Sequence, residues 1–355
     1  MRRSGRLNLV GLLSCAVVAA GGLAGCGRDA ADTRSGPAMV AFVVPNNKLN
    51  FATEMADGFS AGADAVPGVE HTVVGPDIVD GIREVALFHD LTKTHRDGIS
   101  VFTLAPDLFV EPLAKAGAEG IPLICVDNPP LTGSNVELFV GNDNYQLGEM
   151  LADQAIAKLP ADARGTVVIG TTSPGVPVLE LRAEGIRHRL TEVLPGLSVR
   201  GPFDTKQEVA ANHAAWELLV EANPDALAFL GTGDADGWNL AEIRRTMGGT
   251  WIAGAFDLDP KSLQAVKEGH LVLISPEHFV KGVVAGRLQA EHAATGKPLP
   301  QGWIYTPGLA VTMVNIDEIR ARQESAEAKT KWFDAEVNKI LNGGPEYLRP
   351  LSDLR

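Results

Sequence analysis

The sequence predicts an α/β protein made of two similar lobes, each with a parallel sheet covered by helices. Short β-branched runs alternate with longer stretches of helical period, which is the pattern of parallel strands connected by helices. This alternation occurs in two successive series along the chain. In addition, 355 residues exceed the size of one ordinary domain, even without the amino-terminal leader described below. Two lobes are therefore expected.

The first series begins with a strand over residues 39–44. This run is apolar without alternation, as expected for a strand that is buried on both faces. Met55, Phe59 and Ala63 follow at a spacing of four, which predicts a helix. Further strands are expected at 71–74, 99–104, 123–126 and 138–140, with helices near 82–91 and 108–118.

The second series has the same organisation. Strands are expected near 166–169, 226–230, 251–255 and 271–274, with helices near 146–158, 179–190, 209–222 and 240–247. Ligand groups should lie on loops at the carboxyl ends of these strands. The charged segment 321–341 predicts an amphipathic helix that docks on a lobe, and 347–355 a short extended end.

The first 25 residues have the parts of an export signal. Arg2, Arg3 and Arg6 form a basic start, an apolar run covers 9–20, and small residues precede Cys26. The apolar stretch is interrupted by Ser14 and by glycines. It is too short for a membrane-spanning helix, which needs about 20 apolar residues.

The end of this signal, Leu-Ala-Gly-Cys at 23–26, resembles the lipobox of bacterial lipoproteins. The resemblance implies cleavage before Cys26 and attachment of acyl chains to that residue. Residues 26–37 are then a flexible tether. The mature protein is expected on the outer face of the cytoplasmic membrane or in the periplasm, in an envelope of either Gram type.

Charge and cysteine content exclude several classes of function. The net charge of −13 becomes −16 once the three arginines of the signal are removed (−13 − 3), which argues against a nucleic-acid partner. Cys125 is the one cysteine left for the folded part, so neither a disulfide nor a cysteine metal site is expected. The eight histidines are scattered, and no zinc site is expected.

The loop 231–237 does not indicate a cofactor. Its glycine spacing differs from that of a dinucleotide-binding loop, and its acidic residues do not continue into a calcium loop. No motif frames a catalytic serine either. We therefore expect no cofactor, no metal and no enzymatic reaction.

Several short motifs occur in a characteristic order. They are Asp57-Gly58, the run at 120–127 ending in Asp127, Gly-Asn-Asp-Asn at 141–144, Arg-Ala-Glu-Gly at 182–185, the run at 229–234, and Ala-Phe-Asp at 255–257. Together they resemble the ribose-binding-like type I periplasmic binding proteins, which are sugar-binding proteins of bacterial ATP-driven importers. The resemblance covers nearly the whole mature chain.

The resemblance implies two Rossmann-like lobes joined by a three-segment hinge that closes on a ligand. Its expected boundaries are 38–142 with 278–307 for the first lobe and 143–277 with 308–328 for the second. Residues 329–355 would form a carboxyl-terminal helix and tail.

A sugar site needs carboxylates and amides to accept hydroxyl hydrogens, cationic groups to donate, and an aromatic face. Asp127 ends an apolar strand, and in the family this aspartate holds ligand hydroxyls. Without the resemblance, a role in a turn or as a cap would be the favoured interpretation of Asp127. Arg182 stands at the family's ligand-binding arginine. A guanidinium there can bridge two hydroxyls, whereas a surface ion pair is the alternative.

The remaining candidates follow from the same resemblance. Asn128 stands where the family often has arginine, Lys206 near an aromatic position, and Glu277 beside a glutamine position. Turn and helix capping are the other roles open to the asparagines of the first loop. The further candidate ligand residues are Asn46, Asn47, Lys48, Asn50, Phe51, Asp234, Phe256 and Asp257.

These observations predict a monomeric, lipid-anchored receptor that binds a sugar, polyol or similar solute and delivers it to a membrane permease with its ATPase subunit. Three alternatives stay open: a ligand sensor for a chemoreceptor or kinase, a receptor for an autoinducer-2-type signal, and an exported hydrolase. Transcription regulators share the fold but lack an export signal.

Overall fold

The computed structural model describes residues 36–343 and 346–355. The predicted signal peptide, Cys26 and most of the tether lie outside the described residues. From residue 37 onward the chain contains two sheets, each covered by helices on both faces. The predicted α/β fold with two lobes is confirmed.

The first lobe is built on a seven-stranded sheet with the order β13-β11-β5-β4-β3-β1-β2, in which only β13 is antiparallel to its neighbour. Its strands are β1 (Ala38–Val43), β2 (Val69–Val74), β3 (Ile99–Val101), β4 (Leu123–Val126), β5 (Leu138–Gly141), β11 (Gly302–Tyr305) and β13 (Leu348–Arg349). Alternate residues of β1 enter two different cores. Val40 and Phe42 pack on α1 (Asn50–Asp64) and α9 (His278–Thr295), whereas Ala41 and Val43 face α2 (Gly81–Leu91) and α3 (Pro106–Ala118).

The second lobe is built on a six-stranded sheet with the order β12-β10-β9-β8-β6-β7, parallel except for β12. Its strands are β6 (Gly165–Thr171), β7 (Leu197–Asp204), β8 (Ala228–Gly231), β9 (Ile252–Phe256), β10 (Val272–Ser275) and β12 (Leu309–Val311). One face is covered by α4 (Asn144–Ile156) and α5 (Pro177–Val193). The other face is covered by α6 (Val209–Ala222), α7 (Asp234–Thr246) and α8 (Pro260–Lys267).

The chain passes between the two sheets three times. The passages lie between β5 and α4, between β10 and α9, and between β11 and β12. Asn142 in the first passage donates from Nδ2 to the carbonyl of Thr306 in the third, over 2.6 Å. The two passages are therefore tied to each other by a buried hydrogen bond.

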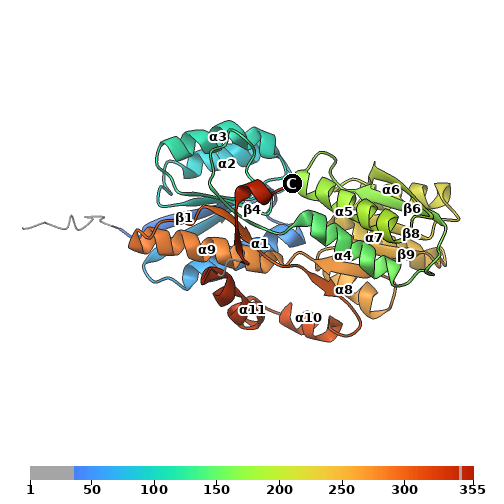
Figure 1. Cartoon of the computed structure of the whole chain (residues 1–355). Coiled ribbons are helices and arrows are strands. Elements are labelled where there is room, and N and C mark those ends of the chain that lie inside the picture. The colour runs from blue at the N-terminus through green and yellow to red at the C-terminus, as the bar shows by residue number, and fades with distance from the viewer. Residues whose placement is uncertain (1–35, 344–345) are drawn as a thin grey trace, which may run out of the picture. The chain divides into compact units, whose positions relative to one another are not determined.

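Helices α1 and α9 pack unusually closely, and glycines make this possible. A Cβ atom on Gly58 would lie 2.1 Å from the carbonyl oxygen of Phe279, and one on Gly282 would lie 2.1 Å from that of Met55. Figure 1 shows α9 beside α1, although the two are far apart in the sequence. This packing fixes the position of the first turn of α9, which reaches the site described below.

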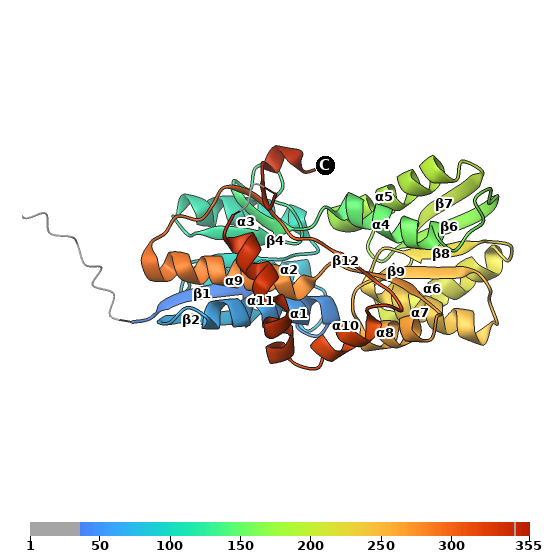
Figure 2. The ribbon, with the colours of Figure 1, turned by 60° about the horizontal axis from the view of Figure 1, so that its bottom comes forward.

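The carboxyl-terminal segment differs from its prediction. Instead of one helix over 321–341, it forms α10 (Ile316–Arg322) and α11 (Ala326–Leu341). The break occurs because Ser325 begins a new helix, where its Oγ accepts a hydrogen bond from the Ala328 amide over 3.1 Å. Helix α11 packs beside α9, and α10 lies against α8 (Figure 2). The predicted extended end contains β13 and a short 3-10 turn at Leu351–Asp353.

Candidate functional site

A small cavity lies where the carboxyl ends of strands from both sheets meet. Its lining comes from the first lobe, the second lobe and the second passage between them, and consists of Phe51, Phe102, Leu104, Asp127, Thr172, Val178, Leu179, Arg182, Gln207, Gly233, Asp234, Asp257 and His278. The space between these side chains measures about 30 Å³, which holds a water molecule or two. A sugar-sized ligand therefore requires the lining to open.

Asp127 follows β4 and is paired with a lysine 154 positions later in the chain. Its backbone has φ = 64°, a left-handed conformation that is uncommon outside glycine. Lys281, fully buried in α9, donates from Nζ to Oδ1 of Asp127. Burial would raise the pKa of Asp127, but the positive charges of Lys281 and Arg182 lower it to about 2. Asp127 is therefore ionised and can accept hydrogen bonds.

His278 links this pair to a second aspartate. Its Nε2 lies 2.7 Å from Oδ1 of Asp257, and its Nδ1 lies 3.2 Å from Nζ of Lys281. Burial and the nearby Lys281 lower the pKa of His278, so the ring is neutral. A neutral ring satisfies both contacts when Nε2–H donates to Asp257 and Nδ1 accepts from Lys281. Asp257, like Asp127, has a left-handed backbone, with φ = 75°.

Arg182 in α5 is held in a fixed orientation. Its Nε donates to Oδ1 of Asn144 and its Nη1 to the carbonyl of Thr232, each over 2.9 Å. The guanidinium lies 4.5 Å from the ring centroid of Phe256. Phe256 therefore packs against the Arg182 guanidinium and does not itself line the cavity. A planar donor held in this way can serve adjacent ligand oxygens.

Two aspartates at the start of α7 have opposite environments. Asp236 is buried and accepts from the side chains of Thr205, Asn212 and Trp216 through Oδ1, and from the Gly233 amide through Oδ2. Asp234 lines the cavity, and its buried Oδ1 has no hydrogen-bond partner. Burial, with the nearby Asp257, raises the pKa of Asp234 well above its usual range. Asp236 is thus part of the framework, whereas Asp234 is open to a ligand.

Phe51 supplies the aromatic wall on the first-lobe side. Its ring lies 5.9 Å from that of Phe102, edge to face, and 6.1 Å from the ring of His278. Leu104, Val178 and Leu179 add apolar surface to the same lining. The cavity therefore combines carboxylates and a guanidinium with an apolar wall, which is the composition expected of a small-molecule site.

The structure brings together Phe51, Asp127, Arg182, Asp234 and Asp257 among the predicted site residues. Three residues of the first loop lie outside the lining. Asn46 accepts from the backbone amides of Lys48 and Leu49, which is the capping role that asparagine commonly plays. Asn47 donates to Asp77 over 2.9 Å, and Lys48 pairs with the same carboxylate at 3.6 Å on the surface.

Four further predicted residues are also outside the lining. Asn50 is the first residue of α1, and its buried Nδ2 has no partner. Asn128 donates to the Thr103 carbonyl over 2.7 Å. Lys206 pairs with Asp204, and the neighbouring Gln207, not Lys206, lines the cavity. Glu277 is bound by Arg322 of α10, whose Nη2 lies 2.7 Å and 2.9 Å from its two carboxylate oxygens.

Sequence reasoning missed His278 and Lys281. One available signal was the position of His278, three residues after a buried strand at a passage between the lobes. The other was a lysine placed three residues later within an apolar stretch. Thr172, a cavity residue one position beyond β6, was missed as well.

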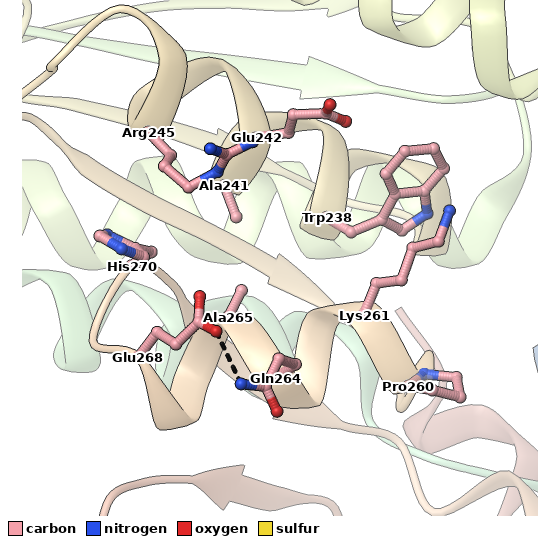
Figure 3. Close-up of a pocket in the computed structure, with 10 residues that line it drawn as sticks. All are labelled: Trp238, Ala241, Glu242, Arg245, Pro260, Lys261, Gln264, Ala265, Glu268 and His270. Atoms are coloured by element: carbon pink, nitrogen blue, oxygen red, sulfur yellow. Dashed lines mark hydrogen bonds between the residues drawn. The ribbon is translucent and has the colours of Figure 1, made fainter.

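A second hollow lies on the surface of the second lobe, between α7 and α8 (Figure 3). It measures about 350 Å³ and includes Trp238, above whose ring Lys261 Nζ lies at 4.0 Å. Gln264 donates to Glu268 over 2.6 Å at its rim. Its lining comes from one lobe and contains no residue at the carboxyl end of a strand. The cavity between the lobes is therefore the better candidate.

The described residues contain neither a metal-binding cluster nor a membrane-spanning helix. Within 36–343 and 346–355, no group of three or more His, Cys, Asp or Glu side chains is arranged to hold a metal ion. In the same part of the chain, no helix is both long and apolar enough to cross a membrane.

Known proteins resemble this chain over most of its length. The D-allose-binding periplasmic protein of Escherichia coli K12 is 25% identical over 259 residues, which are 70% of this chain and 83% of that protein. The xylose/arabinose-binding protein of Sulfolobus acidocaldarius is 24% identical over 208 residues. This match covers 52% of the present chain and about half, 49%, of the Sulfolobus protein.

Solved structures show the same fold. An ABC transporter solute-binding protein from Burkholderia graminis, in complex with D-arabinose, matches with a TM-score of 0.73 and 24% identity over 79% of this chain and 97% of that one. A solute-binding protein from Agrobacterium vitis with bound D-fucose matches with a TM-score of 0.73 and 20% identity, over 80% of this chain and 98% of that one. The family model for the periplasmic binding protein domain matches residues 40–294. The chain therefore belongs to the periplasmic binding protein family, whose members bind solutes outside the cytoplasm and are not enzymes.

Proposed function

We propose that this protein is the substrate-binding component of an ABC importer and that it binds a sugar or polyol between its two lobes. The observation that carries this proposal is the convergence of Asp127, Arg182 and Asp257 on one cavity. These groups accept and donate hydrogen bonds in the combination that a polyhydroxylated ligand needs. The sugar-binding relatives and the sugar-bound solved structures support the same ligand class.

The contacts divide between the lobes. Phe51 and Asp127 belong to the first lobe, and Arg182 and Asp257 to the second. Asp127 and Asp257 would accept hydrogen bonds from ligand hydroxyls, Arg182 would donate to adjacent oxygens, and Phe51 would cover an apolar ring face. Because the full set of contacts exists only when the lobes are together, the ligand stabilises the closed state.

The residues that hold the lobes together must permit this opening. Asp127 keeps its charge through Lys281, which lies in the closely packed α1–α9 pair of the first lobe. Asp257 lies on the second lobe and bonds His278 at the passage. In this proposal the His278–Asp257 contact opens or tilts when the lobes separate, whereas the Lys281–Asp127 pair moves as one piece.

The proposal includes attachment to the membrane through acyl chains on Cys26 and delivery of the ligand to a permease with its ATPase subunit. The receptor acts as a monomer. Cys26→Ala should release the protein from membranes into the soluble fraction after cell fractionation. A variant that stays with the membrane would contradict the anchor and leave the ligand-binding proposal untouched.

A thermal-shift screen of the full chain against pentoses, hexoses and polyols tests the ligand class. A true ligand at about 100 times its dissociation constant adds roughly 2.7 kcal/mol to the free energy of unfolding. Arg182→Met should lose this stabilisation, whereas Lys261→Met, a change in the surface hollow of the second lobe, should keep it. Failure of every sugar and polyol to stabilise the protein, or equal stabilisation of the Arg182 variant, would overturn the proposal.

A further inference from the structure

The charges around the cavity do not balance. Three carboxylates line it, Asp127, Asp234 and Asp257. Two cations accompany them: Arg182 lines the cavity, and Lys281 is bonded to Asp127. His278 is held neutral by its surroundings and adds no charge. If all three carboxyls were ionised, one of them would be left without a cation.

The geometry identifies this carboxylate as Asp234. Asp127 is paired with Lys281, and Asp257 receives a hydrogen bond from His278. Asp234 is 8% exposed, and its Oδ1 is buried without a hydrogen-bond partner. The neighbouring groups that act most strongly on it are all acidic, Asp257 and Asp259 first.

A buried carboxylate oxygen without a partner is costly and needs either a proton or a donor. The nearby Asp236 receives four hydrogen bonds from protein donors. The lobe can therefore provide hydrogen-bond donors to a buried aspartate at this end of α7. At Asp234 it supplies none to Oδ1, although this oxygen belongs to a residue that lines the cavity. Without a ligand, the raised pKa of Asp234 lets the carboxyl hold a proton itself, and a bound ligand that donates to Oδ1 takes over that role.

We propose that the ligand carries a protonated amine, as in an amino sugar or amino polyol, and that Asp234 receives it. This inference rests on the proposed function and narrows its ligand class. An ammonium group restores the charge balance and offers three donors, whereas a hydroxyl offers one donor and no charge. A sugar acid would add a further negative charge to a site that already has an excess, so the cleft discriminates against it.

The test uses the full chain and matched ligand series at constant pH and ionic strength. Each series contains a neutral sugar, its amino-deoxy counterpart and its acid, built on glucose, galactose and arabinose. Affinities are measured by calorimetric titration for the wild type and for Asp234→Asn. In the wild type, the amino sugar of the series that fits best should bind about tenfold to a hundredfold more tightly than its neutral partner, and the acid should bind weakest.

Asp234→Asn should remove this preference, so that amino and neutral sugars bind within about threefold of each other. Asp225→Asn is the matched control, because Asp225 is exposed at the opposite end of β8 and its removal changes the net charge equally. That variant should keep the preference. A neutral sugar that binds the wild type as tightly as its amine, or an unchanged preference in Asp234→Asn, would overturn the inference while the sugar-binding proposal stands. Binding of no member of any series would overturn both.

Discussion

Two clusters of buried charged and titratable side chains meet at the second passage between the lobes, where each contains one of two consecutive residues. The cleft cluster consists of Asp127, Lys281, His278 and Asp257. The hinge cluster consists of Glu54, Glu277, Arg322 and Lys329, in which Arg322 binds Glu277 and Lys329 lies 3.9 Å from Glu54. Glu277 and His278 are neighbours in the chain but enter different clusters.

The clusters differ in what covers them. In the hinge cluster, the guanidinium of Arg322 lies 4.7 Å from the ring centroid of Phe333, and Lys329 Nζ lies 5.3 Å from that of Phe279. None of its four residues lines the cavity. In the cleft cluster, Asp127, Asp257 and His278 line it, and Lys281 contacts two of these lining residues. Buried charge alone therefore does not identify a binding site. The cleft cluster differs in facing the cavity between the lobes, whereas Glu277, which also follows β10, is bound by Arg322 instead.

The largest effect is expected from breaking the hinge cluster. Arg322→Met leaves Glu277 buried without its partner, which should lower the free energy of unfolding by about 3–5 kcal/mol. Urea denaturation measures this loss, and adding Glu277→Gln should recover most of it. A single variant within 1 kcal/mol or so of the wild type would show that the pair has no structural role.

The cleft cluster should also contribute to stability. The stability lost in a single variant should be regained when the partner charge is removed as well. Asp127→Asn leaves Lys281 buried without a counter-charge, so the free energy of unfolding should fall by about 3 kcal/mol. In Asp127→Asn combined with Lys281→Met, neither charge is present, and stability should return close to that of the wild type. Additive losses in the double variant would contradict the pairing.

The hinge cluster should make stability depend on pH. Burial, partly offset by Lys329, raises the pKa of Glu54 to about 7 from an ordinary value of 4.5. A raised pKa means that the folded state binds the proton more tightly. The contribution of Glu54 to the free energy of unfolding is thus complete below about pH 4.5 and lost as pH rises through 7. Its full size is on the order of 3 kcal/mol.

Urea denaturation of the wild type and of Glu54→Gln at several pH values between 4 and 8 measures this effect. The variant should lose stability less steeply than the wild type as pH rises. Parallel curves for the two proteins would show that Glu54 does not titrate in this range.

The smallest effect is expected at the apolar wall of the cleft. Phe51→Leu keeps an apolar side chain but removes the aromatic face, so ligand affinity should fall by about threefold to tenfold. Unfolding without ligand should change little by comparison with the charge variants. Calorimetric titration with the best sugar of the screen gives the ratio, and an unchanged affinity would mean that Phe51 does not contact the ligand.

The sequence was informative where a residue type follows a recognisable strand. Asp127 and Asp257 end short, wholly apolar strands, so their place at the sheet edge was predictable. The residues of α9 were not, because that helix is buried on nearly every side at its start and shows no amphipathic period. A lysine in such a segment cannot be assigned to an aspartate 154 positions away without the fold.

The same limit explains the other differences. The first-loop residues Asn46, Asn47 and Lys48 have binding chemistry, but local hydrogen bonds and the surface Asp77 use it. Strands β11, β12 and β13 have two to four residues each. The third passage separates β11 from β12, and each pairs with a strand of a different sheet. Segments this short contain too few residues for a hydrophobic period to predict a strand.

The role of Asp127 as a ligand acceptor is tested most directly by the affinity of the best sugar for Asp127→Asn/Lys281→Met, in which folding should be preserved but the carboxylate is absent. Calorimetric titration should show binding about a hundredfold weaker than in the wild type, because a charged acceptor for ligand hydroxyls is lost. The double variant Glu277→Gln/Arg322→Met, in the hinge cluster, should bind within about threefold of the wild type. Equal affinities in the wild type and the cleft variant would contradict the assignment of the site.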